Sequence, residues 1–309
     1  MFLAIAAGGV GGALLPTLGS AAARADPTPT LPAEYFRKSN QVTSSGTLYD
    51  NICVWIDGDQ ARMYVPQSVK PGASTRSPIS WFYHGSGSDH NALDGGFTQT
   101  AQAVVDAGGI AICQKAGGTL YSHPTAQALQ VAGYEYMTSV FNLNFHFLRA
   151  TSGGGALAVE TYAAGLIPAV TGMYLVNAVY DIEALYTSGG PFAGSIVSAF
   201  GDDPAGIAAA NPARHAATAW AGAKMRVVVS QPNESDATVP PAQHGLALLS
   251  DAVAVAREAS LRSHPYGHAT PGFSVADYTD AATRWAYNAP DRSAPSVQML
   301  TGAGQVAAG

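Results

Sequence analysis

Short apolar segments alternate with helix-like segments along most of this chain, and this alternation restricts its fold more than any other feature. The strand-like segments lie within PISWFYHG, GGIAICQKAGG, FHFLRATS, AVTGMYLVNAVYD, AKMRVVVSQP and SLRSHPYG. Helical patterning separates them, as in TAQALQVAGYEYMTSVFNLN, and VWIDGDQARMYVP predicts a β-hairpin before the first of them. The alternation predicts an α/β fold with a mostly parallel sheet covered by helices on both faces. In such sheets ligands bind at the carboxyl ends of the strands.

Composition excludes several classes of protein. The 309 residues are enough for one domain with a large core, and 47% of them are apolar while only 12% are charged. These fractions argue against a disordered chain. The formal net charge of -6 gives no basic surface of the kind that nucleic acid binding needs, so no nucleic acid partner is expected.

The first 25 residues have the pattern of a secretory signal peptide. A short apolar run is followed by the small-x-small site Ala23-Arg24-Ala25, which predicts cleavage after Ala25 and a mature chain that begins at Asp26. Because Gly and Pro interrupt the run, we expect no stable membrane span. No Lys or Arg precedes the apolar region, which leaves a retained N-terminal helix as the alternative. The pattern favours a secreted, extracellular protein.

The sequence pattern predicts three further segments of the chain: a linker, an insertion and a tail. Residues 26–49 are rich in Pro, Thr and Ser and are expected to form a linker. Residues 182–223 are too long for a simple connection, so we expect an insertion with its own helices that acts as a lid before the following strand. Residues 287–309 are small and polar, and are expected to form a loosely attached tail.

The stretch ATSGGG contains a candidate nucleophile. Ser152 lies between a predicted strand and a predicted helix, where a tight turn flanked by small residues would raise its hydroxyl above the sheet. Ala150 stands where such turns usually have the first Gly. The alternative is that Ser152 only caps the helix.

Two residues later in the chain have the types and the order that would activate this serine. A serine hydroxyl needs a histidine to accept its proton, and the histidine needs an acid on its other ring nitrogen. Asp236 follows the apolar segment VVVS, and His268 follows the last predicted strand, so the order is Ser, Asp, His. We favour Asp236 over Glu234, because it lies directly before a predicted proline-started helix. We favour His268 over His264, because Gly267 would let its loop approach the serine.

The loop WFYHGSG supplies candidates for an oxyanion hole. Acyl transfer needs N–H donors aimed at the oxygen of the attacked carbonyl. The first candidate is the backbone N–H of Gly153, and the second is the N–H of Ser86 or Gly87. His84, followed by Gly85, is expected to orient this loop.

Together, WFYHGSG, ATSGGG, SDATVPP and the Gly-His of PYGHATPGF resemble the α/β-hydrolase superfamily. The segment IVSAFGDDPAG...ANPARHA resembles the one that serine esterases and prolyl-oligopeptidase-like hydrolases have before the strand of their acid. The resemblance covers residues 50–286 and implies an eight-stranded, mostly parallel sheet that forms the catalytic domain, with the insertion 182–223 as its lid. It also implies a Ser-His-Asp hydrolase that needs no cofactor. Neither cysteine has a His or a second Cys at ligand spacing, so no metal site is expected.

A secreted hydrolase of carboxylic esters fits these features best, acting on a small-molecule, lipid or polymeric ester. A peptidase or an acyltransferase on the same fold is the alternative, followed by a non-catalytic binding protein. The aromatic candidates for an acyl pocket, which are equally compatible with core packing, are Tyr180, Tyr186, Phe192 and Phe200. Cys53 and Cys113 both lie in strand-like runs, and whether they form a disulfide stays open.

Overall fold

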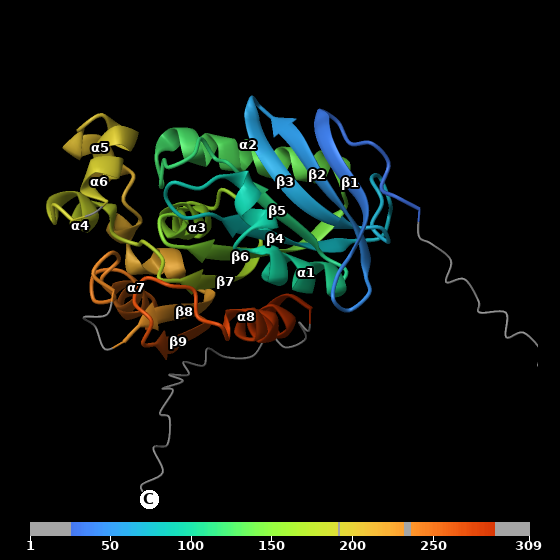
Figure 1. Cartoon of the computed structure of the whole chain (residues 1–309). Helices are drawn as coiled ribbons and strands as arrows, with labels where there is room; N and C mark the ends of the chain where they lie inside the picture. Colours follow the sequence, from blue (N-terminus) through green and yellow to red (C-terminus); the bar gives the residue numbers. More distant parts are fainter. Residues whose placement is uncertain (1–25, 191, 232–235, 288–309) are drawn as a thin grey trace, which may run out of the picture.

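The computed structural model describes residues 26–190, 192–231 and 236–287, and its centre is one twisted sheet (Figure 1). The nine strands are β1 (Glu34–Val42), β2 (Leu48–Ile56), β3 (Asp59–Pro66), β4 (Ser77–Tyr83), β5 (Ile110–Gln114), β6 (Leu143–Thr151), β7 (Val170–Val176), β8 (Lys224–Ser230) and β9 (Glu258–His264). They lie in the order β1-β2-β3-β5-β4-β6-β7-β8-β9. Three pairs are antiparallel: β1 with β2, β2 with β3, and β3 with β5. All other pairs are parallel. The predicted fold class is confirmed, with nine strands instead of eight.

Helices cover both faces of the sheet, as the alternating pattern predicts (Figure 1). One face packs against α2 (Pro124–Val140), α3 (Gly154–Ala163) and α7 (Gly245–Ala252), and the other against α1 (Thr98–Asp106) and α8 (Ser274–Ala282). The strands between these layers are buried on both sides; every residue of β5, for example, is buried. Burial on both faces explains why the strands read as continuous apolar runs in the sequence.

The edge strand β1 lies inside the segment that the sequence analysis assigned to a linker. Its sequence, EYFRKSNQV, is mostly polar, and five of its nine residues are intermediate in exposure while four are exposed. An edge strand with polar side chains shows no apolar run, and charged residues suit an edge because they discourage pairing with other chains. Arg37 of this strand forms ion pairs with Glu34 at 2.6 Å and with the buried Asp50 of β2 at 3.2 Å.

The insertion before β8 forms a separate group of short helices at one end of the sheet (Figure 1). They are α4 (Ile182–Thr187), α5 (Ala193–Phe200) and α6 (Pro204–Ala209), followed by two single-turn helices, Pro212–Arg214 and Ala217–Trp220. Ile182, Leu185, Ile196 and Ile207 form a small core of their own with Tyr121. The predicted helix at the proline pair after Asp236 is wrong: residues 241–244 form turns, and α7 begins at Gly245.

The two cysteines are free and buried. Cys53 on β2 is paired across the sheet with Arg62 of β3, which in turn is paired with Cys113 of β5. One strand therefore separates the two cysteines, and two strand spacings of about 4.8 Å are too far for a disulfide.

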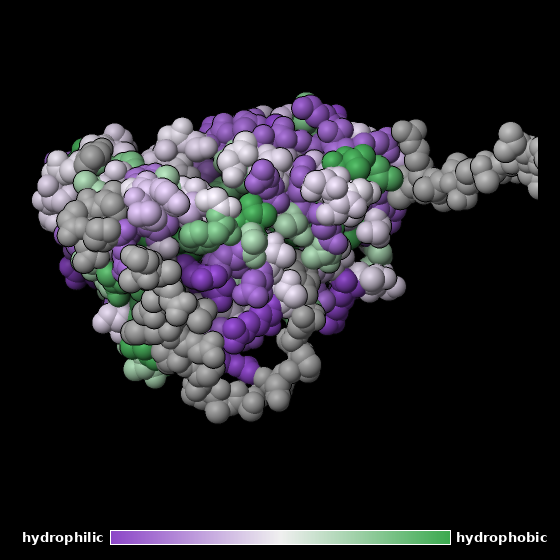
Figure 2. All heavy atoms as spheres, turned by 60° about the horizontal axis from the view of Figure 1, so that its bottom comes forward, coloured by the Kyte–Doolittle hydropathy of each residue, from purple (hydrophilic) through white to green (hydrophobic). Residues whose placement is uncertain are grey.

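The surface is predominantly polar on the face shown in Figure 2, where hydrophobic residues form small separate patches. Within the described ranges, no helix combines the length and apolar character that crossing a membrane requires.

Candidate active site

Ser152 occupies a strained turn between β6 and α3. Its φ of +51° is rare for a residue with a side chain. Three hydrogen bonds hold the turn: the Ser152 N–H donates to Val176 O at 3.2 Å, and its carbonyl accepts from Gly155 N and Val179 N, both at 2.9 Å. The serine is therefore fixed at the carboxyl end of a central strand, in the backbone conformation that exposes a nucleophile.

The glycines after Ser152 are explained by how closely α3 approaches the sheet. A Cβ on Gly154 would lie 2.3 Å from His84 O, and a Cβ on Gly155 would lie 2.5 Å from the Cβ of Ala178. Neither position has room for a side chain. Ala150 is fully buried in β6, which accounts for a small residue before the turn.

The structure brings the three residues Ser152, His268 and Asp236 into one hydrogen-bonded row. His268 Nε2 lies 2.8 Å from Ser152 Oγ, and His268 Nδ1 lies 2.9 Å from Asp236 Oδ2. Asp236 Oδ1 also accepts from the N–H groups of Thr238 at 3.0 Å and Val239 at 2.9 Å. Burial raises the pKa of Asp236, but the hydrogen bonds from His268 and the two N–H groups outweigh it and hold the pKa below its usual value. Asp236 is thus an acceptor that fixes the ring of His268.

His264, the alternative to His268, lies in a different environment. His264 is buried, and its Nε2 lies 3.2 Å from Asn177 Oδ1. Glu234, the rival acid, lies outside the described residues. Gly267 has a φ of +62° and its N–H donates to Ser230 Oγ at 3.0 Å, so the loop between the two histidines turns back over the sheet.

Asn177 was missed by the sequence analysis and supports the His268 loop. Its Nδ2 donates to Ala269 O at 2.9 Å, while its side-chain oxygen faces His264. Asn177 directly follows β7, and a polar residue at the carboxyl end of a buried strand is the signal that could have indicated it.

The oxyanion candidates are separated by their hydrogen bonds. The Gly87 N–H donates to Thr119 Oγ1 at 2.7 Å, so it is occupied and the prediction for this residue is wrong. Within the described part of the chain, the N–H groups of Ser86 and Gly153 donate to no protein acceptor. A Cβ on Gly153 would lie 3.2 Å from Ser86 N, so the two groups are close together. Both N–H groups could therefore donate to a ligand oxygen at Ser152.

Side chains on neighbouring elements hold this loop. His84 Nε2 lies 2.9 Å from Lys115 O, and its Nδ1 lies 3.0 Å from Gly85 O. Gly85 approaches the serine so closely that a Cβ there would lie 3.3 Å from Ser152 Cβ. These contacts place His84 and Gly85 within the loop and beside Ser152, and their supporting role stays a prediction.

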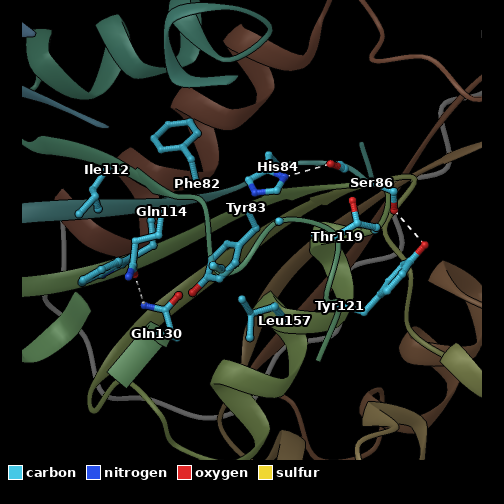
Figure 3. Close-up of a pocket in the computed structure, with 16 residues that line it drawn as sticks. Phe82, Tyr83, His84, Ser86, Ile112, Gln114, Thr119, Tyr121, Gln130 and Leu157 are labelled. Atoms are coloured by element: carbon cyan, nitrogen blue, oxygen red, sulfur yellow. Dashed lines mark hydrogen bonds between the residues drawn. The ribbon is translucent and has the colours of Figure 1, made fainter. Parts of the chain in front are cut away.

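A chain of hydroxyl groups connects the loop to the inserted helices, and no local sequence pattern indicated it. Ser86 Oγ donates to Tyr121 OH at 3.0 Å, as Figure 3 shows. Tyr121 OH lies 2.5 Å from Ser195 Oγ in α5, which donates to Phe192 O at 2.8 Å. The geometry of the oxyanion loop is therefore coupled to the insertion.

A small cavity lies behind this loop (Figure 3). Its volume of about 30 Å³ is enough for about one water molecule. Gln114 and Gln130 hydrogen bond across it at 3.2 Å, and Tyr83 also lines it. It is too small for a substrate.

A larger groove of about 410 Å³ lies beside Ser152. It is bordered by Gly85 and Thr151, which lie next to Ser152, and by Thr270, two residues after His268. The remaining lining residues are Ser88, Asp89, Asn91, Ala92, Gly95, Gly96 and Phe97. Among the described residues, this groove begins beside Ser152 and is larger than the cavity behind the loop.

The four predicted pocket aromatics have different environments. The ring of Phe192 lies 6.2 Å from that of His268, so this residue borders the site. Tyr180 is 1% exposed and its hydroxyl donates to Asp251 at 2.7 Å, so it belongs to the core and the pocket assignment is wrong. Tyr186 donates to Asp202, and Phe200 packs edge-on against His123.

Solved structures share this architecture at low sequence identity. An S-formylglutathione hydrolase from Agrobacterium tumefaciens matches over 81% of this chain and 97% of its own, with 12% identity and a TM-score of 0.60. An acetyl xylan esterase from Paenibacillus sp. R4 matches over 81% and 88%, with 15% identity and a TM-score of 0.57. A thermostable esterase from Pseudomonas putida ECU1011 matches over 79% and 84%, with 18% identity and a TM-score of 0.55.

The chain has the α/β-hydrolase fold. The matches cover most of this chain and of each similar structure, so they include the sheet and both helical layers. No protein-family model and no curated protein sequence matches the chain. At these identities the comparison establishes the fold, and the chemistry depends on the residues of this chain.

Proposed function

We propose that this protein is a secreted serine hydrolase that cleaves carboxylic esters through an acyl-enzyme on Ser152. The observation that carries the proposal is the row of hydrogen bonds from Ser152 Oγ through His268 to Asp236, at 2.8 and 2.9 Å. The esterases among the similar structures agree with it.

The geometry supports a two-step reaction. His268 Nε2 accepts the proton of Ser152 as Oγ attacks the ester carbonyl, and the N–H groups of Ser86 and Gly153 bind the oxyanion. The tetrahedral intermediate collapses with loss of the alcohol, which takes the proton from His268. Water then attacks the acyl-enzyme with His268 again as base, which releases the acid and free Ser152. His268 carries the proton in both steps: it takes one from Ser152 and gives it to the alcohol, then takes one from water and returns it to Ser152.

The direct test is hydrolysis of p-nitrophenyl esters of graded chain length by the full chain. Ser152→Ala should lower kcat by about 10⁴-fold or more. The exposed Ser139 of α2 offers a matched control, because Ser139→Ala removes a hydroxyl that bonds only its own helix. A fluorophosphonate probe should label Ser152 in folded protein and not in heat-denatured protein. Folded protein without label on Ser152 would contradict the proposal.

The same assay separates the neighbouring activities. Faster cleavage of peptide anilides than of esters would indicate a peptidase, and transfer of the acyl group to an added alcohol would indicate an acyltransferase. The proposed export is tested separately: protein recovered from the medium of a secreting host should begin at Asp26 when its N-terminus is sequenced.

A further inference from the structure

Two exposed aromatic rings lie side by side on the antiparallel end of the sheet. Tyr35 of β1 is 41% exposed and Trp55 of β2 is 45% exposed, with ring centroids 5.2 Å apart. The other three tryptophans, Trp81, Trp220 and Trp285, are at most 2% exposed. A large apolar side chain held at the surface beside a second one marks a binding surface more often than an isolated exposed residue does.

Polar side chains fix this pair. Tyr35 OH lies 3.1 Å from Nε2 of the buried His90, and Gln60 Nε2 donates to the same hydroxyl at 3.2 Å. The Tyr35 ring is therefore held in place through its hydroxyl while the residue stays partly exposed. Such preorganised rings lose little conformational entropy when a ligand packs on them.

The aromatic pair adjoins the groove that begins at the candidate nucleophile. His90 belongs to the short helix His90–Asp94, and its sequence neighbours Asp89 and Asn91 line the groove. Gly85 and Thr151, which lie next to Ser152, line the same groove. Tyr35 is therefore hydrogen-bonded to the segment that forms part of the wall of the groove beside Ser152.

The lining of the groove favours a neutral ligand with many hydroxyl groups. Its polar side chains are Ser88, Asp89, Asn91, Thr151 and Thr270. They offer hydroxyl, amide and carboxylate groups but no cation, so the groove does not suit phosphate or another anion. The apolar side chains among its lining residues are Ala92 and the buried Phe97.

We propose that this surface binds a saccharide, so that the proposed esterase acts on acyl groups carried by a sugar chain. The esterified sugar would lie in the polar groove as the alcohol part of the ester, and a following sugar would stack on Tyr35 and Trp55. The C–H face of a pyranose packs on an aromatic ring while its hydroxyls hydrogen bond around the edge. This substrate class depends on the proposed function, but the binding surface does not.

The first experiment compares two esters on the same protein. The probes are an O-acetylated xylotetraose and p-nitrophenyl acetate, which is too small to reach Trp55. In Trp55→Ala, the ratio of kcat/KM for the tetrasaccharide to kcat/KM for p-nitrophenyl acetate should fall by about 3- to 10-fold. Val42→Ala is the matched control, because Val42 is 56% exposed at the opposite end of β1 and its removal should leave the ratio unchanged. An unchanged ratio in Trp55→Ala would overturn the proposal.

The second experiment needs no catalysis. Because Trp55 is the only strongly exposed tryptophan, acrylamide quenching of the full Ser152→Ala chain reports mainly on it. Unacetylated xylotetraose or cellotetraose should protect it from quenching. Protection without any ester hydrolysis by the wild type would refute the proposed function and keep the sugar site. Protection by phosphatidylcholine vesicles and by neither oligosaccharide would replace the saccharide with a lipid surface.

Discussion

The carboxylate of Asp236 shows how hydrogen bonds determine the protonation state of a residue in the candidate site. It is buried, which by itself favours the neutral acid, yet His268 and two backbone N–H groups stabilise the charged form. The ring of His268 is thereby held with Nε2 toward Ser152. One strained residue, Ser152, and one ionised acid define the geometry.

The lowered pKa of Asp236 predicts a specific dependence of stability on pH. The folded state binds this proton less tightly than the unfolded chain, whose carboxyl has a pKa of about 4. The stabilisation is therefore present above about pH 4 and is lost as the pH falls through the lower, folded-state value. Asp236→Asn should flatten the fall in the free energy of unfolding on the acid side, and urea denaturation between pH 6 and 3 measures it.

Asp57→Asn is the control for this titration. Asp57 lies in the exposed β2–β3 turn, where a positive φ of 50° suits Asn as well as Asp. This variant should keep the acid dependence of the wild type. If the free energy of unfolding of Asp236→Asn depends on pH as that of the wild type does, hydrogen bonds do not hold the carboxyl of Asp236 in its charged form.

Asp236→Asn should also lower kcat by about 10³- to 10⁴-fold, because the ring of His268 loses its acceptor.

At the scale of elements, the junction of β6 and α3 positions Ser152. The helix begins two residues after it, at Gly154, and its first turn lies against the ends of β4 and β7. This close packing is possible because Gly154 and Gly155 have no side chains.

Gly154→Ala tests this contact. The added Cβ would meet backbone atoms of Tyr83, the last residue of β4, and of His84, which follows it. Backbone atoms cannot move aside as a flexible side chain would. We expect a loss of about 1–3 kcal/mol in the free energy of unfolding and a larger relative loss of activity, because Ser152 moves with the helix. Gly194→Ala in α5 is the control: nothing lies within 4 Å of its Cβ position, so the helix should gain slightly. Equal stability of the two variants in urea denaturation would refute the packing argument.

The elements also show which features the sequence could predict. The buried strands and the order Ser, Asp, His follow from local patterns, because apolar runs and turn residues are properties of neighbouring positions. The edge strand β1 was missed because its polar residues carry no such pattern. The bond from Gly87 to Thr119 and the burial of Tyr180 under Trp220 depend on contacts between distant segments, which no local pattern records.

At the scale of the whole molecule, the last helix closes one face of the sheet through a buried ion pair. Arg226 of β8 lies 2.7 Å from Asp277 of α8, and their side chains are 2% and 3% exposed. Tyr278 and Trp285 complete this layer against Phe147. The segments that carry Asp236 and His268 connect these strands and helices, so the site depends on the layer staying in place.

Asp277→Asn should therefore destabilise the whole fold. Arg226 would keep its buried charge without its main partner, at a cost of about 3–5 kcal/mol in the free energy of unfolding. Asp280→Asn is the matched control, because Asp280 also contacts Arg226, at 3.1 Å, but its side chain is 65% exposed. An exposed partner of this kind contributes less than about 1 kcal/mol. Urea denaturation, followed by far-ultraviolet circular dichroism, measures the free energy of unfolding of both variants. Equal losses of this free energy would mean that burial of the Arg226–Asp277 pair does not determine its contribution to stability.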